Sequence, residues 1–432
     1  MELAGWDTVT AVSIEAVNRM LAARPGELID EFAFAGDTFG TRYQGSGTLD
    51  AWRILPGRTG DLLTLALPIG RGQVTAGPAT ADLAGLTAVV MLSLDLLPRD
   101  AATGPGPARL VFALGKAART GDDPVPGAVT PVALTGPAAS LDRLGDLGRR
   151  IVLNGIATAL CERAKVLSSV LAEVDLVPPG SADPLAPVHP AYVYLRPSER
   201  DAGHLAVLGT RSTRDAGGLP RTVDPALLKA GTEVAFAMSA ERFLAAVVLP
   251  GLPEVFGGDA SAADLVCVPG RGEIRETAAF GIRPVKEGAI WYTPRVTYLS
   301  ARVVGGDLAV RVEGDCDLKA GISMTYWVTG RSRLVFDPAA GTIAFTPHGT
   351  PQSGSTADIP LWFVLGGPLV EAITRLVVTI ITDDLTAVLG SRRGPAGLER
   401  WSGRAVRWCG ARAIAVERAE LDGGFAVGGR LA

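Results

Sequence analysis

A strand-like run that passes directly into a helix is the feature that most constrains the fold of this 432-residue chain. Thr8–Val12 is rich in β-branched residues, which favour strands, and Ser13 follows it as a predicted helix N-cap. Glu15 lies in the first turn, where the helix dipole favours an acid, and Pro25 with Gly26 ends the helix. Three apolar residues share one face of this predicted helix: Ile14, Val17 and Leu21.

The same order of features recurs near the middle of the chain. Val234–Met238 is strand-like, Ser239 is the predicted cap, Glu241 lies in the first turn, and Pro250 with Gly251 ends the helix. Its apolar face contains Phe243 and Val247. Because these features repeat in one order, we predict two related halves, residues 1–180 and 181–432.

Each half also contains strand-like runs and one long helical pattern. Leu62–Ile69 and Leu86–Leu97 read as strands in the first half, and Leu308–Glu313 alternates apolar and polar residues in the second. Helical spacing predicts one long helix over Leu141–Val174 and another over Pro368–Leu389. We therefore expect an α+β fold in which long amphipathic helices pack on strongly curved antiparallel sheets.

Such a sheet leaves an apolar groove wherever it curves more than its helix can fill. The alternative, that side chains fill the concave side completely, stays open at this point. The second helix also has an alternative, because its β-branched residues favour a strand while its length and period favour a helix. The predicted groove-lining residues are Ile14, Val17, Leu21, Leu153, Ile156, Leu160, Leu167, Phe243, Val247, Leu369, Ile373, Val377 and Ile380.

Composition argues against several classes of protein. A net charge of −4 and an aromatic content of 6% disfavour nucleic-acid binding. No basic start precedes an apolar stretch at the N-terminus, so we expect no signal peptide and cytoplasmic synthesis, with release by a non-classical route left open. The longest uncharged apolar candidate, Ile359–Val370, is too short to span a bilayer, so we expect no transmembrane segment and a soluble protein. The four cysteines form no CxxC pair, which leaves their disulfide status open.

No combination of residues typical of an active site is found in the sequence. The three histidines, His189, His204 and His348, are far apart and none lies in an HExxH motif. Asp315 and Asp317 lack the ligand spacing of a calcium loop, so we interpret them as solvated charges. We expect a non-enzymatic protein without catalytic residues, bound metal or cofactor.

An arginine-rich segment near the C-terminus is a candidate for anion recognition. Arginine binds phosphate through its planar fork, and the interleaved Trp401 and Trp408 suit a membrane interface. The favoured alternative is that these are ordinary surface arginines and that the tryptophans belong to the core. The candidate headgroup or partner patch is Arg392, Arg393, Arg404 and Arg407.

The opening residues Gly5–Val9, followed by Ser13 and Val17-Asn18, resemble the clostridial forty-seven-kilodalton protein family, which is encoded beside botulinum-type neurotoxins. The resemblance continues through Val248–Gly251 to Ala419–Gly429. That family belongs to the tubular lipid-binding (TULIP) superfamily, so the resemblance implies an elongated fold of helices on bent sheets. It also implies lipid or phosphoinositide as a ligand, or a protein partner encoded nearby.

Two functions follow from these observations. The first is binding of a lipid or another hydrophobic ligand in the apolar groove. Burial of one methylene contributes about 0.8 kcal/mol, and a bilayer offers nearly the same gain, so such a site would exchange lipids rather than sequester them. The alternative is an accessory or scaffolding protein of a toxin-like gene cluster, which acts through protein contacts and holds no lipid.

Overall fold

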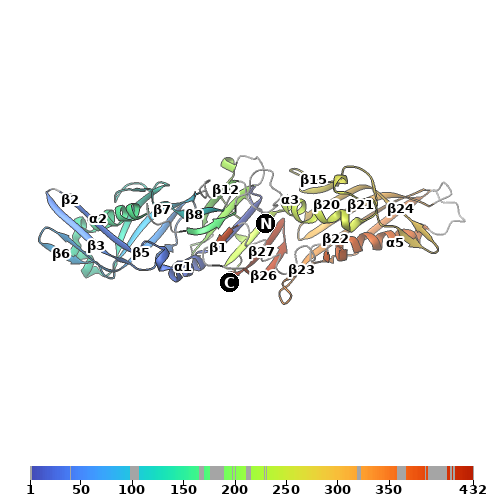
Figure 1. Ribbon diagram of the computed structural model, residues 1–432. Helices are drawn as coiled ribbons and strands as arrows, with labels where there is room; N and C mark the ends of the chain where they lie inside the picture. Colours follow the sequence, from blue (N-terminus) through green and yellow to red (C-terminus); the bar gives the residue numbers. More distant parts are fainter. Residues whose placement is uncertain are drawn as a thin grey trace.

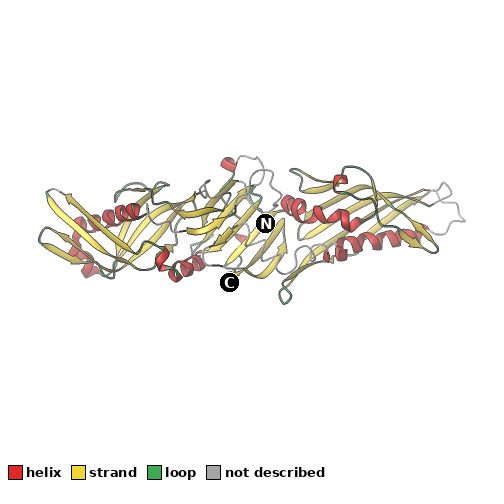
Figure 2. Ribbon diagram, in the orientation of Figure 1, coloured by secondary structure: helices red, strands yellow, loops and turns green. Residues whose placement is uncertain are grey.

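The computed structural model describes residues 2–38, 40–97, 107–164, 170–175, 189–196, 198–199, 201–210, 216–227, 229, 231–318, 323–357, 366–384, 386–387, 406–408, 411 and 414–431. The molecule is elongated, with one sheet at each end and a third sheet between them (Figure 1). Both chain termini lie at the central sheet (Figure 1). Strands predominate throughout, as Figure 2 shows.

The central sheet joins strands that are distant in the sequence. β1 (Thr8–Ser13) pairs with β14 (Val234–Ser239) in antiparallel register, with Val12 opposite Val234. The strand order is β12-β13-β1-β14-β27-β26. β1 and β14, the two strands that lead into the capped helices, therefore lie at the centre of this sheet. A hairpin flanks each of them on the side away from the other: β12–β13 beside β1, and β26–β27 beside β14. The flanking strands are β12 (His189–Leu195), β13 (His204–Thr210), β26 (Ile414–Leu421) and β27 (Gly424–Leu431).

The central sheet combines strands from both of the predicted halves, residues 1–180 and 181–432. Strands β12 and β13, which we assigned to the C-terminal half, lie beside β1. The proposed boundary between residues 180 and 181 lies outside the described residues, and the division itself stays a prediction.

The N-terminal sheet has the path β2-β3-β5-β7-β8-β11-β25, with further short strands attached. Its last strand, β25, comes from the C-terminal part of the chain and pairs with β11. The strands are β2 (Glu31–Thr38), β3 (Thr41–Leu49), β4 (Arg53–Leu55), β5 (Leu62–Ala76), β6 (Ala79–Asp82), β7 (Thr87–Leu97), β8 (Ala108–Phe112), β9 (Lys116–Ala117), β10 (Ala128–Thr135), β11 (Val170–Val174) and β25 (Val406–Trp408).

The C-terminal sheet has the path β15-β16-β20-β21-β22-β23, and a separate hairpin is formed by β18 and β19. Neighbouring strands along this path are antiparallel. The strands are β15 (Leu265–Val268), β16 (Glu273–Glu276), β17 (Phe280–Gly281), β18 (Val285–Glu287), β19 (Ile290–Tyr292), β20 (Arg295–Val304), β21 (Asp307–Asp317), β22 (Ser323–Asp337), β23 (Thr342–Pro347) and β24 (Gln352–Ala357).

The helices occupy much less of the described chain than the strands do. The α-helices are α1 (Ile14–Ala23), α2 (Ala138–Arg163), α3 (Ala240–Phe243), α4 (Leu252–Phe256) and α5 (Gly366–Thr379). Short 3-10 helices cover Pro25–Glu27, Ala216–Gly218, Pro225–Leu227, Leu249–Gly251 and Ala262–Asp264, and π-helical turns cover Leu244–Val248 and Ile380–Asp384.

The predicted α+β class with long amphipathic helices is therefore wrong, because the fold is mainly β. The helix predicted over Leu141–Val174 is interrupted at Gly145, whose φ of 59° and ψ of 178° are not helical, and it ends at Arg163. Val170–Val174 forms strand β11 instead, between β8 and β25. Its apolar residues fit a helical period, but their β-branching and the two neighbouring strands favour the sheet.

The second predicted helix, Pro368–Leu389, is helical rather than extended, but it is a regular α-helix only in part, and residues 388 and 389 lie outside the described residues. Regular α-helix stops at Thr379, and the chain continues as a π-helical turn. In this region the Thr374 and Thr382 hydroxyls donate to carbonyls four residues earlier, a contact that loosens helical geometry.

Both predicted N-caps are confirmed. The Ser13 hydroxyl accepts from the Ala16 amide at 3.2 Å, and the Ser239 hydroxyl accepts from the Arg242 amide at 3.2 Å. Each serine therefore satisfies one of the amides that a helix start leaves unpaired. The helix after Ser239 differs from the first, because it is α-helical only to Phe243 before the π-helical turn.

The inner strands of the central sheet, β1 and β14, are buried on both faces, which explains why β1 lacks the alternation of a half-exposed strand. Val12 belongs to the main core, whereas Val9 and Ala11 belong to a second core on the opposite face. That second core is completed by Trp6, whose indole nitrogen donates to the Pro220 carbonyl at 2.8 Å.

Candidate binding surfaces

The predicted groove-lining residues lie inside the main core. Each of them except Leu167, which lies outside the described residues, belongs to one contiguous cluster of buried side chains. Their exposed fractions range from 0% for Val17 to 7% for Leu21. A side chain that faced a hollow large enough for water would keep accessible area there. The low exposed fractions therefore indicate that, in the described part of the chain, neighbouring side chains fill the space around these residues. Their role as ligand contacts stays a prediction.

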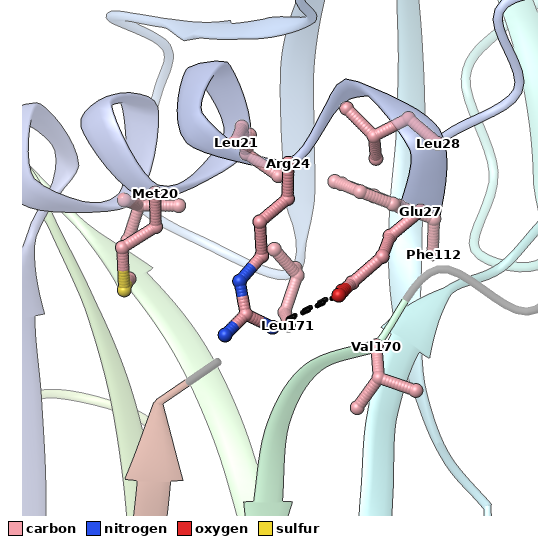
Figure 3. A pocket seen from close by; sticks show the side chains of 9 residues that line it. Met20, Leu21, Arg24, Glu27, Leu28, Phe112, Val170 and Leu171 are labelled. Carbon is pink, nitrogen blue, oxygen red and sulfur yellow. Dashed lines mark hydrogen bonds and ion pairs between the residues drawn. The ribbon is translucent and has the colours of Figure 1, made fainter. Parts of the chain in front are cut away.

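One apolar pocket reaches the surface beside α1. Its apolar lining comes from Val17, Met20, Leu21, Leu28, Phe112, Val170 and Leu171. Arg24 and Glu27 complete the lining and form an ion pair at 3.1 Å (Figure 3). The volume open to the centre of a water molecule is about 20 Å³, which is enough for roughly one water and too little for an acyl chain.

A larger open cleft lies on the outer face of the C-terminal sheet, with a volume of about 540 Å³. Its lining includes three arginines and a histidine: Arg302, Arg311, Arg331 and His348. The sequence patterns did not predict this cleft, although Arg311 is one of the polar residues in the predicted alternation over Leu308–Glu313. In the sequence, the feature that indicates this cleft is the recurrence of arginine at outward-facing strand positions. Only the pairing register of the strands shows that these positions are neighbours.

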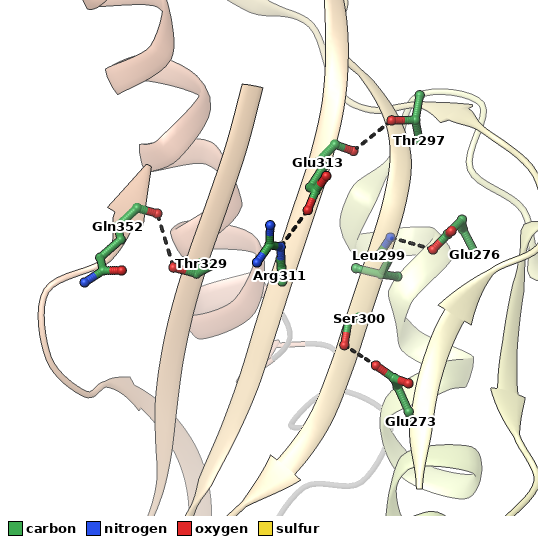
Figure 4. Close-up of polar contacts among 9 residues, drawn as sticks. All are labelled: Glu273, Glu276, Thr297, Leu299, Ser300, Arg311, Glu313, Thr329 and Gln352. Carbon is green, nitrogen blue, oxygen red and sulfur yellow. Dashed lines mark hydrogen bonds and ion pairs between the residues drawn. The ribbon is translucent and has the colours of Figure 1, made fainter. Parts of the chain in front are cut away.

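Two buried carboxylates stabilise the same face. The Asp307 carboxylate accepts from Arg333 Nε at 3.1 Å and contacts His348 Nδ1 at 2.7 Å. Burial alone would raise the pKa of Asp307, but the contacts with His348 and Arg333 hold this pKa below its ordinary value. Glu273 is similar: burial acts to raise its pKa, and hydrogen bonds from Ser300 and Arg275 bring this pKa below the usual range. Figure 4 shows the contact with Ser300.

The predicted arginine patch is only partly described. Arg407 lies on β25 and forms ion pairs with Glu173 and Asp175, both at 3.2 Å. Trp408 is buried, as the favoured alternative expected. Arg392, Arg393, Arg404 and Trp401 lie outside the described residues.

The histidines are not brought together into a site. His189 and His204 are on neighbouring strands of the central sheet, whereas His348 follows β23 in the C-terminal sheet. Burial lowers the pKa of His204, the nearby Glu15 and Asp201 opposing that shift. Among the residues that the structure describes, no group of three or more His, Cys, Asp or Glu could hold a metal ion. No described helix has the length and apolarity needed to cross a membrane.

Comparison with known proteins identifies the family. The profile of the OrfX-like family, described as Protein OrfX2/OrfX3/P47, matches residues 3–398. Protein P47 of Clostridium botulinum (strain Kyoto / Type A2) is 24% identical over 249 residues, which are 58% of this chain and 56% of that protein. The matched region thus spans little more than half the length of this curated relative.

Two solved structures share the fold over nearly the full length. The structure of P47 from Clostridium botulinum A2 has a TM-score of 0.78 at 19% identity, covering 100% of this chain and 98% of that one. The crystal structure of P47 of Clostridium botulinum E1 has a TM-score of 0.79 at 20% identity, covering 99% and 100%. On the family match, which extends over most of the sequence, this chain belongs to the OrfX2/OrfX3/P47 family.

Proposed function

We propose that the protein is a non-enzymatic accessory protein that binds other proteins through its outer surface. The observation that carries this proposal is the filled interior: the described candidates for a lipid groove pack against one another with almost no accessible area. A binding protein with such an interior contacts its partners from outside. The resemblance to a family encoded beside neurotoxins supports a partner encoded nearby.

Co-expression with the products of neighbouring genes tests this proposal. We expect at least one neighbour to co-elute with the protein in size-exclusion chromatography, with a light-scattering mass equal to the sum of the two chains. The same neighbours co-expressed with an unrelated protein of similar size and charge serve as the control. Separate elution of every neighbour would contradict the accessory role.

A second candidate, binding of a hydrophobic ligand, is favoured by the apolar pocket beside α1. Seven apolar side chains line it, and the Arg24–Glu27 pair provides charges that could meet a polar headgroup (Figure 3). At about 20 Å³ the pocket would have to widen, so binding predicts that α1 moves away from β11.

Sedimentation with liposomes tests this second candidate. If an acyl chain enters the pocket, Met20→Trp should fill the entrance and reduce lipid binding, whereas a substitution at the exposed Leu147 should not. Equal binding by both variants would exclude the pocket as the ligand site.

A further inference from the structure

We propose that the open cleft on the outer face of the C-terminal sheet binds a small anion with two or more phosphate groups, held by Arg302, Arg311 and Arg331. This site is separate from the interior and from the pocket beside α1. The experiments that test this anion site are therefore independent of those that test the proposed accessory function.

Strand register brings the three arginines together. Arg302 on β20 pairs with Ala309 on β21, which in turn pairs with Arg331 on β22, so the two arginines flank one alanine in a single row. Neighbouring strands lie about 4.8 Å apart, which separates the two arginine Cα atoms by about 10 Å. Arg311 lies two residues further along β21 and points to the same face as Ala309.

The neighbouring row adds polar residues to the lining, although the Ser300 hydroxyl already donates to Glu273 and the Thr329 hydroxyl to the Gln352 carbonyl. Ser300 pairs with Arg311, which pairs with Thr329, and Thr329 pairs with Gln352 on β24. These side chains line the cleft together with the arginines. Figure 4 shows this row from Ser300 to Gln352 across the strands.

The carboxylates of this face are already engaged, which leaves a surplus of positive charge. Glu273 is opposite Arg302 in register and interacts with its charge at longer range, but its hydrogen bonds come from Arg275 at 3.0 Å and from the Ser300 hydroxyl. Asp307 is held by Arg333 and His348.

Arg311 pairs with Glu313 at 2.6 Å, so its charge is partly neutralised. Within the described residues, Arg302 and Arg331 have no carboxylate at ion-pair distance, and no acid lines the cleft. The surplus therefore rests on two arginines at opposite sides of the hollow.

The centre of the cleft is hollow because the residue there is small. Ala309, whose side chain is a single methyl group, lies between the two arginines in the row. A cleft of similar size in the N-terminal sheet, about 480 Å³, has Glu162 as its charged lining residue. A cleft of this volume on a sheet of this protein is therefore not always lined by arginines.

Phosphate is the chemistry that this arrangement recognises best. The guanidinium fork donates two parallel hydrogen bonds to a tetrahedral oxyanion, and charge-assisted bonds of this kind are strong. The Cα atoms of the two arginines lie about 10 Å apart, and each further phosphate group adds negative charge and oxygen acceptors that the two guanidinium forks and Arg311 can share. The ligand should therefore bind more tightly as its number of phosphates increases.

Calorimetry with inorganic phosphate, pyrophosphate and triphosphate at constant ionic strength tests the proposal. We expect triphosphate to bind at least about ten-fold more tightly than phosphate, and the Arg302→Gln/Arg331→Gln double variant to lose about ten-fold or more in affinity. Arg53→Gln/Arg295→Gln removes the same charge from exposed strand positions outside the cleft and should change affinity less than two-fold. Unchanged melting temperatures would show that the variants fold.

Ala309→Leu gives a test that leaves every charge in place. The larger leucine side chain occupies the centre of the cleft and leaves the net charge unchanged. The affinity for triphosphate should therefore fall. Sedimentation with vesicles that contain a doubly phosphorylated lipid, compared with neutral vesicles, identifies the source of the phosphate groups. Vesicle binding that disappears in the double variant assigns the cleft to a headgroup, and soluble triphosphate binding alone assigns it to a free ligand. No binding of either probe, or equal losses in the cleft and control variants, would overturn the proposal.

Discussion

Truncation of Leu160 to alanine should strongly destabilise the protein if the interior is filled. Leu160 lies on α2 with 0% of its surface exposed and belongs to the main core. Leucine-to-alanine changes in filled cores cost roughly 2–5 kcal/mol, because the lost burial is joined by the cost of the cavity left behind. A leucine facing an open groove would behave as a surface residue, with a cost of about 0.5 kcal/mol or less.

Leu147→Ala is the matched control, since Leu147 lies on the same helix and is 55% exposed. Urea unfolding followed by circular dichroism gives the free energy of unfolding for both variants, and equal m-values make the comparison valid. We expect a loss of at least about 2 kcal/mol for Leu160→Ala and almost none for Leu147→Ala. Similar small losses for the two variants would refute the filled interior.

Three further predictions concern single side chains. Ser13→Ala removes the N-cap bond to the Ala16 amide and should cost about 1 kcal/mol in urea unfolding, whereas Ser13→Thr should restore most of it; no loss would show that the cap is unimportant. Because the pKa of Asp307 is lower in the folded state, its stabilisation is present above its ordinary pKa near 3.8 and is lost as the pH falls through the folded value. Unfolding measured from pH 6 to pH 3 should therefore show a smaller acid-induced loss for Asp307→Asn than for the unchanged protein, and identical slopes would contradict this. Burial raises the pKa of the Cys316 thiol to about 11, with Asp315 and Asp317 adding to the shift, so at pH 8 a thiol reagent should label Cys316 only after unfolding.

The sequence patterns were most informative where one local interaction decides the structure. Ser13 and Ser239 begin their helices as predicted, because a cap depends on residues within one turn. The alternation over Leu308–Glu313 forms β21 with its apolar residues buried. Each of these depends on short-range chemistry.

The errors arose where distant strands decide the structure. Val170–Val174 has apolar residues that suit either a helix or a strand, and its partner β25 comes from residues 406–408. No local pattern reveals that pairing. The arginine cleft was missed for the same reason, because Arg302, Arg311 and Arg331 become neighbours only through the register of three strands.

Native mass spectrometry of the protein, purified without detergent, tests the central claim of a filled interior most directly. The account predicts the mass of the polypeptide alone, before and after extraction with organic solvent. A stoichiometric apolar molecule that dissociates on extraction would contradict it and would favour the hydrophobic-ligand function instead.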